Sequence, residues 1–283
     1  MTDELLTTSL LNQVDAPDPW LGLRYTVNLY QGCQYACVYC NSHIARSKSQ
    51  PYIEGQVNPA TLDLFEEQLA SLATIGTIGS SSGDPYMPLE ASCEITRQTL
   101  EVIAARGFPA HIMTKNDLVL RDIDLLEKVS RVYAAVTFGI TTPHDDLGKK
   151  LEPGASLVSE RLRAMETLAS RGILTGVLMR PVLPFLEDNP EDIRSLIEKA
   201  ARAGASYILP VFGVTLQDSQ RPGFYRELDR LFPGLGRKYR DRYGDQRWCP
   251  CPNEGELQIL FDQTCAELEI TTRMPIYRPG GKV

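Results

Sequence analysis

The chain has 283 residues, enough for one large domain with a substantial core, and its composition of 43% hydrophobic and 23% charged residues is ordinary for a soluble globular protein. No stretch approaches the roughly 18 consecutive apolar residues of a membrane-spanning helix, so we expect no membrane span. The formal net charge of −7 excludes a chain that is basic throughout, as a general nucleic-acid coat would be.

Six strands are expected to alternate with helices after an irregular N-terminal arm, residues 1–23. Short apolar runs predict the strands, and amphipathic segments with capping residues or terminal glycines predict the helices. Two helices are expected to begin at Asn-Pro pairs, with Asn58 and Asn189 as N-caps. The expected strands are 24–30, 73–78, 110–114, 131–140, 173–179 and 207–212, and the expected helices are 58–72, 90–106, 122–129, 156–171 and 189–204.

These strands are short and apolar, as in a parallel sheet that is covered on both faces. Right-handed crossovers would curl such a sheet towards a barrel, and six strand–helix units fall short of the eight that close one. Residues 24–213 therefore predict an α/β fold, an incomplete (β/α)6 TIM-type barrel. Its chemistry is expected at the carboxyl ends of the strands.

Residues 214–283 change character and predict a helical C-terminal extension that covers the open side of the barrel. Aromatic and leucine residues recur at helical spacing over 224–243, interrupted by Pro233 and Gly234, and a last helix is expected over 254–268. Residues 221–247 hold eight Arg or Lys against four acids. We favour a solvated helix face for this positive excess, and a phosphate-binding surface is the alternative.

Three cysteines lie together directly after the first expected strand. They are Cys33, Cys37 and Cys40, in a C-x3-C-x2-C pattern with Tyr39 before the last. Cys thiolates are the usual ligands of iron–sulfur clusters, and three ligands leave one of the four irons of a cubane open to another molecule. Two other interpretations stay open: a structural zinc site with His43 as the fourth ligand, and three unrelated buried thiols.

This motif resembles the signature of the radical S-adenosylmethionine (radical SAM) superfamily, and the resemblance extends from about residue 25 to 212. Further motifs follow the strands in order: GDPYMPLE at 83–90, Thr114-Lys115, Ile140-Thr141-Thr142 with Leu151-Glu152-Pro153, and RPVLP at 180–184. As a set they look like the branch that includes spore photoproduct lyase. The resemblance implies a [4Fe–4S] cluster on the three cysteines, and SAM that is reductively cleaved to a 5′-deoxyadenosyl radical, which abstracts a hydrogen atom from a substrate.

The resemblance also implies roles for side chains at the strand ends. Tyr39 matches the aromatic residue that the signature carries before its third Cys. Lys115 would place its ammonium on the methionyl carboxylate of SAM, and Thr141 would bond the ribose hydroxyls, with a capping role as the equal alternative. The residues that lie where the family binds the amino-acid group of SAM, or that serve turn chemistry instead, are Ser81, Ser82 and Asp84.

The sequence departs from spore photoproduct lyase at three places. The hydrogen-donating Cys of that enzyme lies just before the Asp-Pro pair, whereas residues 80–83 here contain no thiol. Asn41 stands where a Tyr would follow the third cluster Cys, and Gly139 stands where a Ser is expected for the ribose of SAM. These departures argue against repair of spore photoproduct more than against cleavage of SAM.

Three residues outside these motifs are candidates for catalysis. Cys249 and Cys251 form a C-x-C pair that could reach the barrel mouth, either to donate a hydrogen atom or to hold a second metal with Cys265. His144 lies on an expected active-face loop and could line the substrate pocket. Buried structural roles are expected for Cys93 and His111.

Two hypotheses of different classes follow. The first is a radical SAM enzyme that receives electrons from a donor such as flavodoxin or ferredoxin, with nucleic acid as one candidate substrate. The second is a non-catalytic zinc or iron–sulfur protein using Cys33, Cys37, Cys40 and His43. Seven cysteines, an odd number with three in a metal-like group, and no secretory signal in residues 1–20 favour the cytoplasm.

Overall fold

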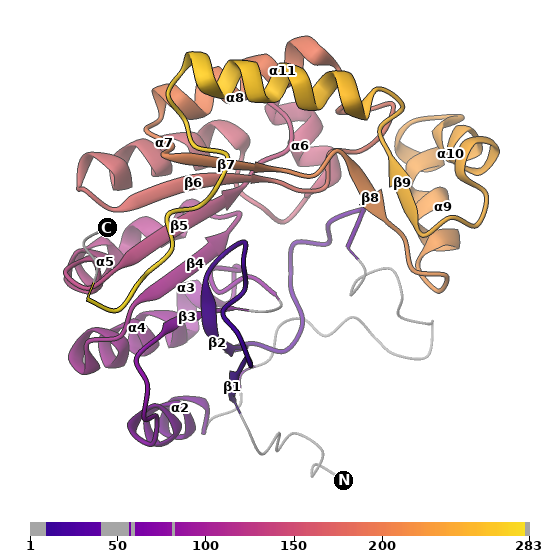
Figure 1. The fold of residues 1–283 in the computed structure, drawn as a ribbon. Coiled ribbons are helices and arrows are strands. Elements are labelled where there is room, and N and C mark those ends of the chain that lie inside the picture. The colour runs from indigo at the N-terminus through magenta and orange to yellow at the C-terminus, as the bar shows by residue number, and fades with distance from the viewer. Residues whose placement is uncertain (1–9, 41–56, 58–59, 81–82, 281–283) are drawn as a thin grey trace, which may run out of the picture.

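The structure, a computed structural model, describes residues 10–40, 57, 60–80 and 83–280 and shows a curved sheet flanked by helices (Figure 1). The strands are β1 (Leu11–Gln13), β2 (Leu23–Val27), β3 (Thr77–Gly79), β4 (Ala110–Thr114), β5 (Ala134–Gly139), β6 (Leu174–Met179), β7 (Tyr207–Pro210), β8 (Gly213–Thr215) and β9 (Trp248–Pro250). The helices are α2 (Thr61–Ala70), α3 (Glu90–Cys93), α4 (Ile95–Arg106), the 3₁₀ helix η1 (Asp117–Asp122), α5 (Ile123–Ser130), α6 (Asp145–Leu151), α7 (Val158–Ser170), α8 (Pro190–Arg202), α9 (Arg221–Leu231), α10 (Leu235–Tyr243) and α11 (Glu254–Glu267).

The main sheet has seven strands in the order of the sequence, β1 to β7. Strands β2 to β7 run parallel, with helical crossovers between them, and β1 pairs antiparallel with β2. The order runs from β1 at one edge to β7 at the other, so the sheet stays open and does not close into a barrel. The predicted α/β fold with an incomplete barrel of six parallel strands is therefore confirmed.

Two local expectations were wrong. The N-terminal arm is not wholly irregular, because Leu11 is buried and pairs with Val27; a strand of three residues is too short to show a period. The helix expected over 90–106 is two helices, which divide at Glu94 with a φ of +52°. The buried carboxylate of Glu90 accepts from the backbone N–H of Thr96 at 2.9 Å, which caps the second helix with a distant side chain.

Helix α8 begins as its sequence predicts. The side chain of Asn189 accepts from the backbone N–H of Glu191 at 2.8 Å, and Pro190 occupies the first helical turn. The corresponding prediction at Asn58 lies outside the described residues. None of the helices in the described part of the chain combines the length and apolarity that a membrane span requires.

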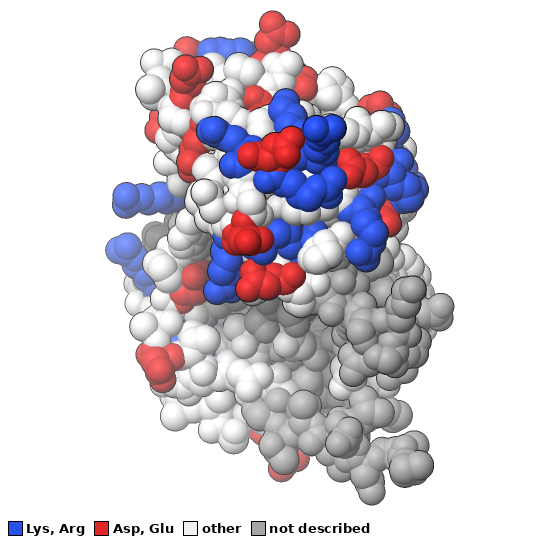
Figure 2. Space-filling model, turned by 90° about the vertical axis from the view of Figure 1, so that its right-hand side faces the viewer, with Lys and Arg blue, Asp and Glu red and all other residues white. Residues whose placement is uncertain are grey.

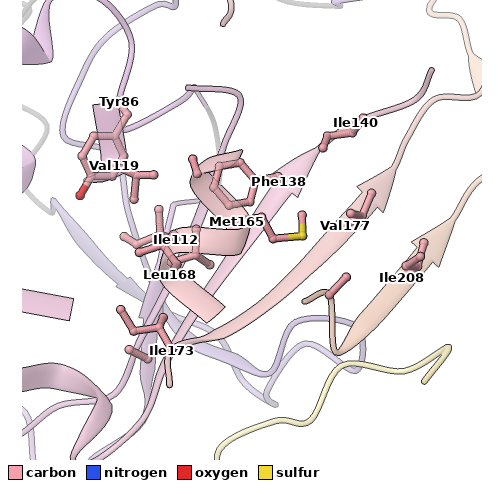
Figure 3. Close-up of a cluster of buried hydrophobic side chains, with 14 of the residues drawn as sticks. Tyr86, Ile112, Val119, Phe138, Ile140, Met165, Leu168, Ile173, Val177 and Ile208 are labelled. Carbon is pink, nitrogen blue, oxygen red and sulfur yellow. The ribbon is translucent and has the colours of Figure 1, made fainter. Parts of the chain in front are cut away.

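The main core lies between the sheet and the helices (Figure 3). Every residue of β5 is buried, because this strand is central to the sheet and covered on both sides. Figure 3 shows Phe138 and Ile112 on the strands pointing towards Met165 and Leu168 on α7. Each such side chain is worth about 2–5 kcal/mol against truncation to alanine, so this core fixes the strand ends that surround the site.

The concave face of the sheet carries a polar layer and is covered by a late segment of the chain, residues 271–277. The ring of His111 bonds the hydroxyl of Thr137 at 2.6 Å, and burial lowers the pKa of His111 to about 4, so the ring is neutral and structural as expected. Ile208 donates to the carbonyl of Thr271 at 3.0 Å, and the hydroxyl of Tyr133 donates to the carbonyl of Pro275 at 2.8 Å.

The part of the chain after residue 213 is not helical throughout. Strands β8 and β9 form a two-stranded antiparallel sheet that lies beside α9 and α10 in Figure 1. Gln220 donates from its side chain to the carbonyl of Tyr39 at 2.9 Å, so the segment between β8 and α9 contacts the cysteine loop. Helix α11 packs on α8, where Arg194 pairs with Glu267 at 3.1 Å, and so adds to the outer layer of helices.

Candidate functional site

A cavity of about 800 Å³ opens at the carboxyl ends of the parallel strands. Its volume lies in the range of about 300–1,000 Å³ that is typical of ligand pockets. The walls come from the cysteine loop (residues 32–40), from the ends of β4, β5 and β6, and from the two-stranded sheet β8–β9. The predicted site residues in the wall are Cys33, Cys37, Tyr39, Cys40, Asp84 and Lys115.

The cysteine loop is fixed by backbone contacts on two sides. Val38 donates to the carbonyl of Leu151 at 2.9 Å, and Gly154 donates to the carbonyl of Tyr35 at 3.0 Å. A Cβ on Gly154 would lie 2.6 Å from the carbonyl oxygen of Gln34, so only glycine allows this approach. The Leu-Glu-Pro-Gly sequence at the end of α6, residues 151–154, therefore supports the backbone of the cysteine loop.

The three thiols line one wall of the cavity and are not in disulfides. Cys37 is 7% exposed, and Cys33 and Cys40 are half-buried. Burial raises the pKa of the Cys33 thiol to about 11 and the pKa of the Cys37 thiol further. Metal ligation requires thiolates, so these thiols need a strongly positive metal centre beside them to lose their protons.

The geometry of the thiols bears on which metal centre they suit. Among the described residues, no three Cys, His, Asp or Glu side chains converge closely enough to hold a single ion. A cubane does not need such convergence, because each thiolate binds a different iron. Three thiols from one loop on the wall of a roomy cavity therefore fit a [4Fe–4S] cluster. The fourth ligand of the zinc alternative, His43, lies outside the described residues.

A buried charge network lies beneath the cysteine loop. The carboxylate of Glu152, which is 3% exposed, pairs with Arg161 at 2.6 Å and with Lys115 at 3.5 Å, and it accepts from the hydroxyl of Tyr39. Burial alone would raise the pKa of Glu152, but Lys115 and Arg161 hold it below its ordinary value. Glu152, Lys115 and Arg161 are therefore all ionised, and the network holds Tyr39 next to Cys40 in the loop.

Lys115 points from the end of β4 across the end of β5. A Cβ on Gly139 would lie 2.4 Å from its Nζ, so a serine at this position would displace the lysine. The ammonium also lies 5.9 Å from the centre of the Tyr39 ring. Gly139, which departs from the expected Ser, thus leaves space for Lys115, which matches the expected pattern.

Asp84 is 7% exposed and holds two strand ends together. Its carboxylate accepts from the hydroxyl of Thr114 at 2.8 Å and from the backbone N–H groups of Tyr86 at 2.8 Å and Lys115 at 2.7 Å. Burial raises its pKa against the effect of these donors. Asp84 thus positions the backbone of Lys115, while Ser81 and Ser82 lie outside the described residues.

Thr141 is buried and does not line the cavity. Its hydroxyl donates to the carboxyl of Glu187 at 2.6 Å, and the backbone N–H of Leu183 donates to the other oxygen at 2.9 Å. Burial raises the pKa of Glu187 to about 8 despite these donors. Sequence analysis missed Glu187, because a glutamate after an apolar loop gives no sign of its burial.

The raised pKa of Glu187 makes folding stability depend on pH. The folded chain keeps a proton that the unfolded chain releases near pH 4.5, so this group's contribution to stability falls as pH rises from there to about 8. We expect Glu187→Gln to flatten the dependence by roughly 2–4 kcal/mol between about pH 5 and 8, measured by urea unfolding. The exposed Glu166→Gln is the control, and an unchanged slope in Glu187→Gln would contradict the burial argument.

The three candidate catalytic residues are not in the described wall of the cavity. His144 is half-exposed, and its ring pairs with Asp192 at 2.8 Å. Cys249 and Cys251 are 0% and 2% exposed and contact the backbone carbonyls of Gln246 and Val182. Both thiols pack in apolar clusters, so the structure does not bring this pair to the mouth or join it with Cys265 in a metal site.

The cavity residues that were not predicted as site residues include both tryptophans of the chain and an arginine. Trp20 comes from a turn in the N-terminal arm, Arg180 follows β6, and Trp248 begins β9. Arg180 was quoted only as part of a motif, and the two indoles lie in segments that showed no strong periodicity. The one signal that could have found Trp20 and Trp248 was composition, because they are the two tryptophans of the chain.

Figure 2 shows the face over α9 and α10, where blue and red side chains are interspersed. Four cations on this face pair with nearby acids: Arg221, Arg230, Arg237 and Arg240. The other four, with no ion pair among the described residues, are Arg226, Lys238, Arg242 and Arg247. The positive excess predicted from the sequence therefore remains unneutralised at the surface.

Comparison with known proteins places this architecture in a family. The model of the radical SAM superfamily matches residues 27–200, more than half of the chain. An uncharacterized protein of Mycobacterium tuberculosis is 31% identical over 258 residues, which are 85% of this chain and 73% of that protein. A radical SAM Nα-GlyT isomerase of Pseudomonas phage M6 is 25% identical over 252 residues, or 84% of this chain and 50% of that protein.

Solved structures show the same fold at low sequence identity. A cysteine-to-serine mutant of spore photoproduct lyase has a TM-score of 0.67 and 18% identity, and the match covers 91% of this chain and 77% of that chain. A spore photoproduct lyase mutant with bound AdoMet and dinucleoside spore photoproduct has a TM-score of 0.63 and 18% identity, covering 87% and 74%. At this level of identity the likeness shows that the chain shares the fold of spore photoproduct lyase.

Proposed function

This chain belongs to the radical SAM superfamily, and on that premise we propose that it is an enzyme with a [4Fe–4S] cluster on Cys33, Cys37 and Cys40. When bound, the cluster and SAM supply reductive cleavage of SAM and a 5′-deoxyadenosyl radical that abstracts a hydrogen atom from the substrate. The observation that carries the proposal is that all three thiols line one cavity of about 800 Å³. That volume leaves room for a nucleoside cofactor and part of a substrate.

The residues around the cavity have distinct proposed tasks. Lys115 offers its ammonium to the methionyl carboxylate of SAM, and Glu152 holds that ammonium in place from behind. Tyr39 supports the loop beside the third thiol through its bond to Glu152. Asp84 positions Lys115 through its backbone N–H, which revises the role expected for the carboxylate in binding the amine of SAM.

Other assignments rest on the family alone. Ser81 and Ser82 keep their proposed place at the amino-acid group of SAM. Thr141 is now proposed as a support for Glu187, since its hydroxyl is already used in that bond. Residues 1–23, 24–213 and 214–283 are proposed as arm, catalytic core and extension of one protein.

We propose nucleic acid as the substrate class. Spore photoproduct lyase, whose fold this chain shares, has been solved with a dinucleoside spore photoproduct. The absence of a thiol in residues 80–83 argues for a reaction other than repair of that lesion. The electron donor is proposed to be a flavodoxin or ferredoxin, and the seven free cysteines suit a reducing cytoplasm.

Anaerobic metal analysis tests the proposal. We expect about four irons and four sulfides per chain, and an EPR spectrum of the reduced cluster that changes when SAM is added. With a chemical reductant as the electron source, the protein should then convert SAM to methionine and 5′-deoxyadenosine. Stoichiometric zinc without iron, or a cluster whose spectrum SAM leaves unchanged, would reject the enzyme in favour of a binding protein.

A further inference from the structure

Both tryptophans of the chain line the cavity, and both are exposed, Trp20 by 47% and Trp248 by 40%. An indole left open to water inside a cavity forgoes the free energy of burial, about 25 cal/mol per Å² of apolar surface. Exposed apolar surface in a concave site usually marks where a ligand binds. Two such surfaces, from segments far apart in the sequence, line one cavity, and each offers a flat apolar face to a planar ligand.

Each indole sits on rigid backbone. Trp20 lies in a tight turn, in which Leu21 donates to the carboxylate of Asp18 at 2.6 Å and Gly22 donates to its carbonyl at 2.7 Å. The ring of Trp248 lies over Gly213 on the paired strand, where a Cβ would approach it to 2.6 Å. Preorganised aromatic surfaces lose little entropy when a ligand stacks on them.

Arg180 supplies charge in the same cavity. It is exposed at the end of β6 and lines the cavity, and within the described ranges no acid pairs with it. The other cation of the cavity wall, Lys115, already pairs with Glu152. The cavity therefore holds an unneutralised guanidinium, which is well suited to bind a phosphate in bidentate fashion.

The surface that leads to Trp248 is also positive. Arg247 precedes it and bonds the side chain of Gln217 at 2.7 Å, while Arg226, Lys238 and Arg242 lie on the neighbouring helices without an ion pair among the described residues. Figure 2 shows this face, with blue side chains in excess. Stacking rings at a mouth reached over a positive surface are the two features by which proteins bind single-stranded nucleic acids.

We infer that Trp20, Trp248 and Arg180 form a nucleotide subsite for single-stranded DNA or RNA, with the base stacked on an indole and a phosphate on Arg180. The inference deepens the proposed function and rests on it for the reaction that follows. The recognised chemistry is a planar base joined to an anionic phosphate. An acidic peptide carries the anion but not a base, and so lacks the group that the indoles would stack.

The experiment titrates anaerobically purified full-length protein with short oligodeoxythymidine and oligouridine strands. Both tryptophans report on the subsite, so we expect either strand to quench the intrinsic fluorescence and, when labelled, to gain anisotropy. Trp248→Ala should weaken binding by about tenfold or more, and Trp248→Phe should retain most of it. Arg180→Gln should make the negative slope of log Kobs against log salt shallower by about 0.7. Tighter binding of oligodeoxythymidine would identify the ligand as DNA, and tighter binding of oligouridine would identify it as RNA.

Matched variants far from the cavity separate the subsite from general effects. Ile259→Ala removes an exposed apolar side chain on α11, and Arg163→Gln removes an exposed cation on α7, so neither should change binding. The inference is overturned if neither strand binds, if binding ignores Trp248 and Arg180, or if polyglutamate quenches the tryptophans and the oligonucleotides do not. Binding is measured without SAM or reductant, so its failure is distinct from failure of SAM cleavage.

Discussion

Replacing Cys33, Cys37 or Cys40 singly with serine is expected to abolish the metal centre and the activity that depends on it. Each thiolate would hold a different iron of one cubane, so two remaining ligands from one loop cannot retain it. We expect iron to fall from about four to less than one per chain, and 5′-deoxyadenosine formation to fall by more than ~100-fold. That loss exceeds the 10–100-fold effect of residues that only orient a ligand.

The chain offers a control thiol for this experiment. Cys93 ends α3, is half-buried like Cys33 and Cys40, and does not line the cavity. Cys93→Ser should therefore keep both its iron and its activity. Full iron occupancy in any of the three loop variants would show that the cluster is held elsewhere, and the assignment of the loop would then be wrong.

The second large effect is expected at Glu152. Glu152→Gln leaves two cations, Arg161 with 1% and Lys115 with 18% side-chain exposure, without their shared anion. An uncompensated buried charge typically costs about 3–5 kcal/mol, so the thermal midpoint should fall by roughly 10 °C. Urea and thermal unfolding of the apo-protein measure the loss apart from any effect on the cluster.

A surface pair provides the comparison. Glu127 pairs with Arg171 at 2.9 Å, but their side chains are 39% and 56% exposed, so Glu127→Gln should cost at most about 1 kcal/mol. Adding Arg161→Met to Glu152→Gln should recover part of the stability, because the stranded charge is removed. If Glu152→Gln and Glu127→Gln lower the free energy of unfolding by the same amount, Glu152 does not neutralise buried charges.

The fold was predictable because its signals are local. Each parallel strand is a short apolar run, and helices such as α8 begin with an Asn-Pro cap that a sequence displays openly. The cysteine loop was predictable for the same reason, since its ligands lie within eight residues. The split at Glu94 was not, because it depends on hydrogen bonds of a buried side chain that no period reveals.

The rest of the site depends on contacts between distant segments. Sequence could rank Lys115 as a ligand-binding residue, but not show that Glu152 pairs with it or that Gly139 makes room for it. Trp20 and Trp248 lie 228 positions apart and meet at one cavity only through the fold. Conversely, Cys249 and Cys251 looked reactive by spacing, yet each packs among apolar side chains.

The crossing of the concave face by residues 271–277 has a consequence for biosynthesis. Ala135, Tyr207 and Leu209 are covered there by Met274, which leaves the ribosome long after β5. At about 5–20 residues per second, an interval on the order of ten seconds separates the two. Until Met274 emerges, Ala135, Tyr207 and Leu209 lack its cover, so these side chains beside the polar layer stay open to water on the nascent chain.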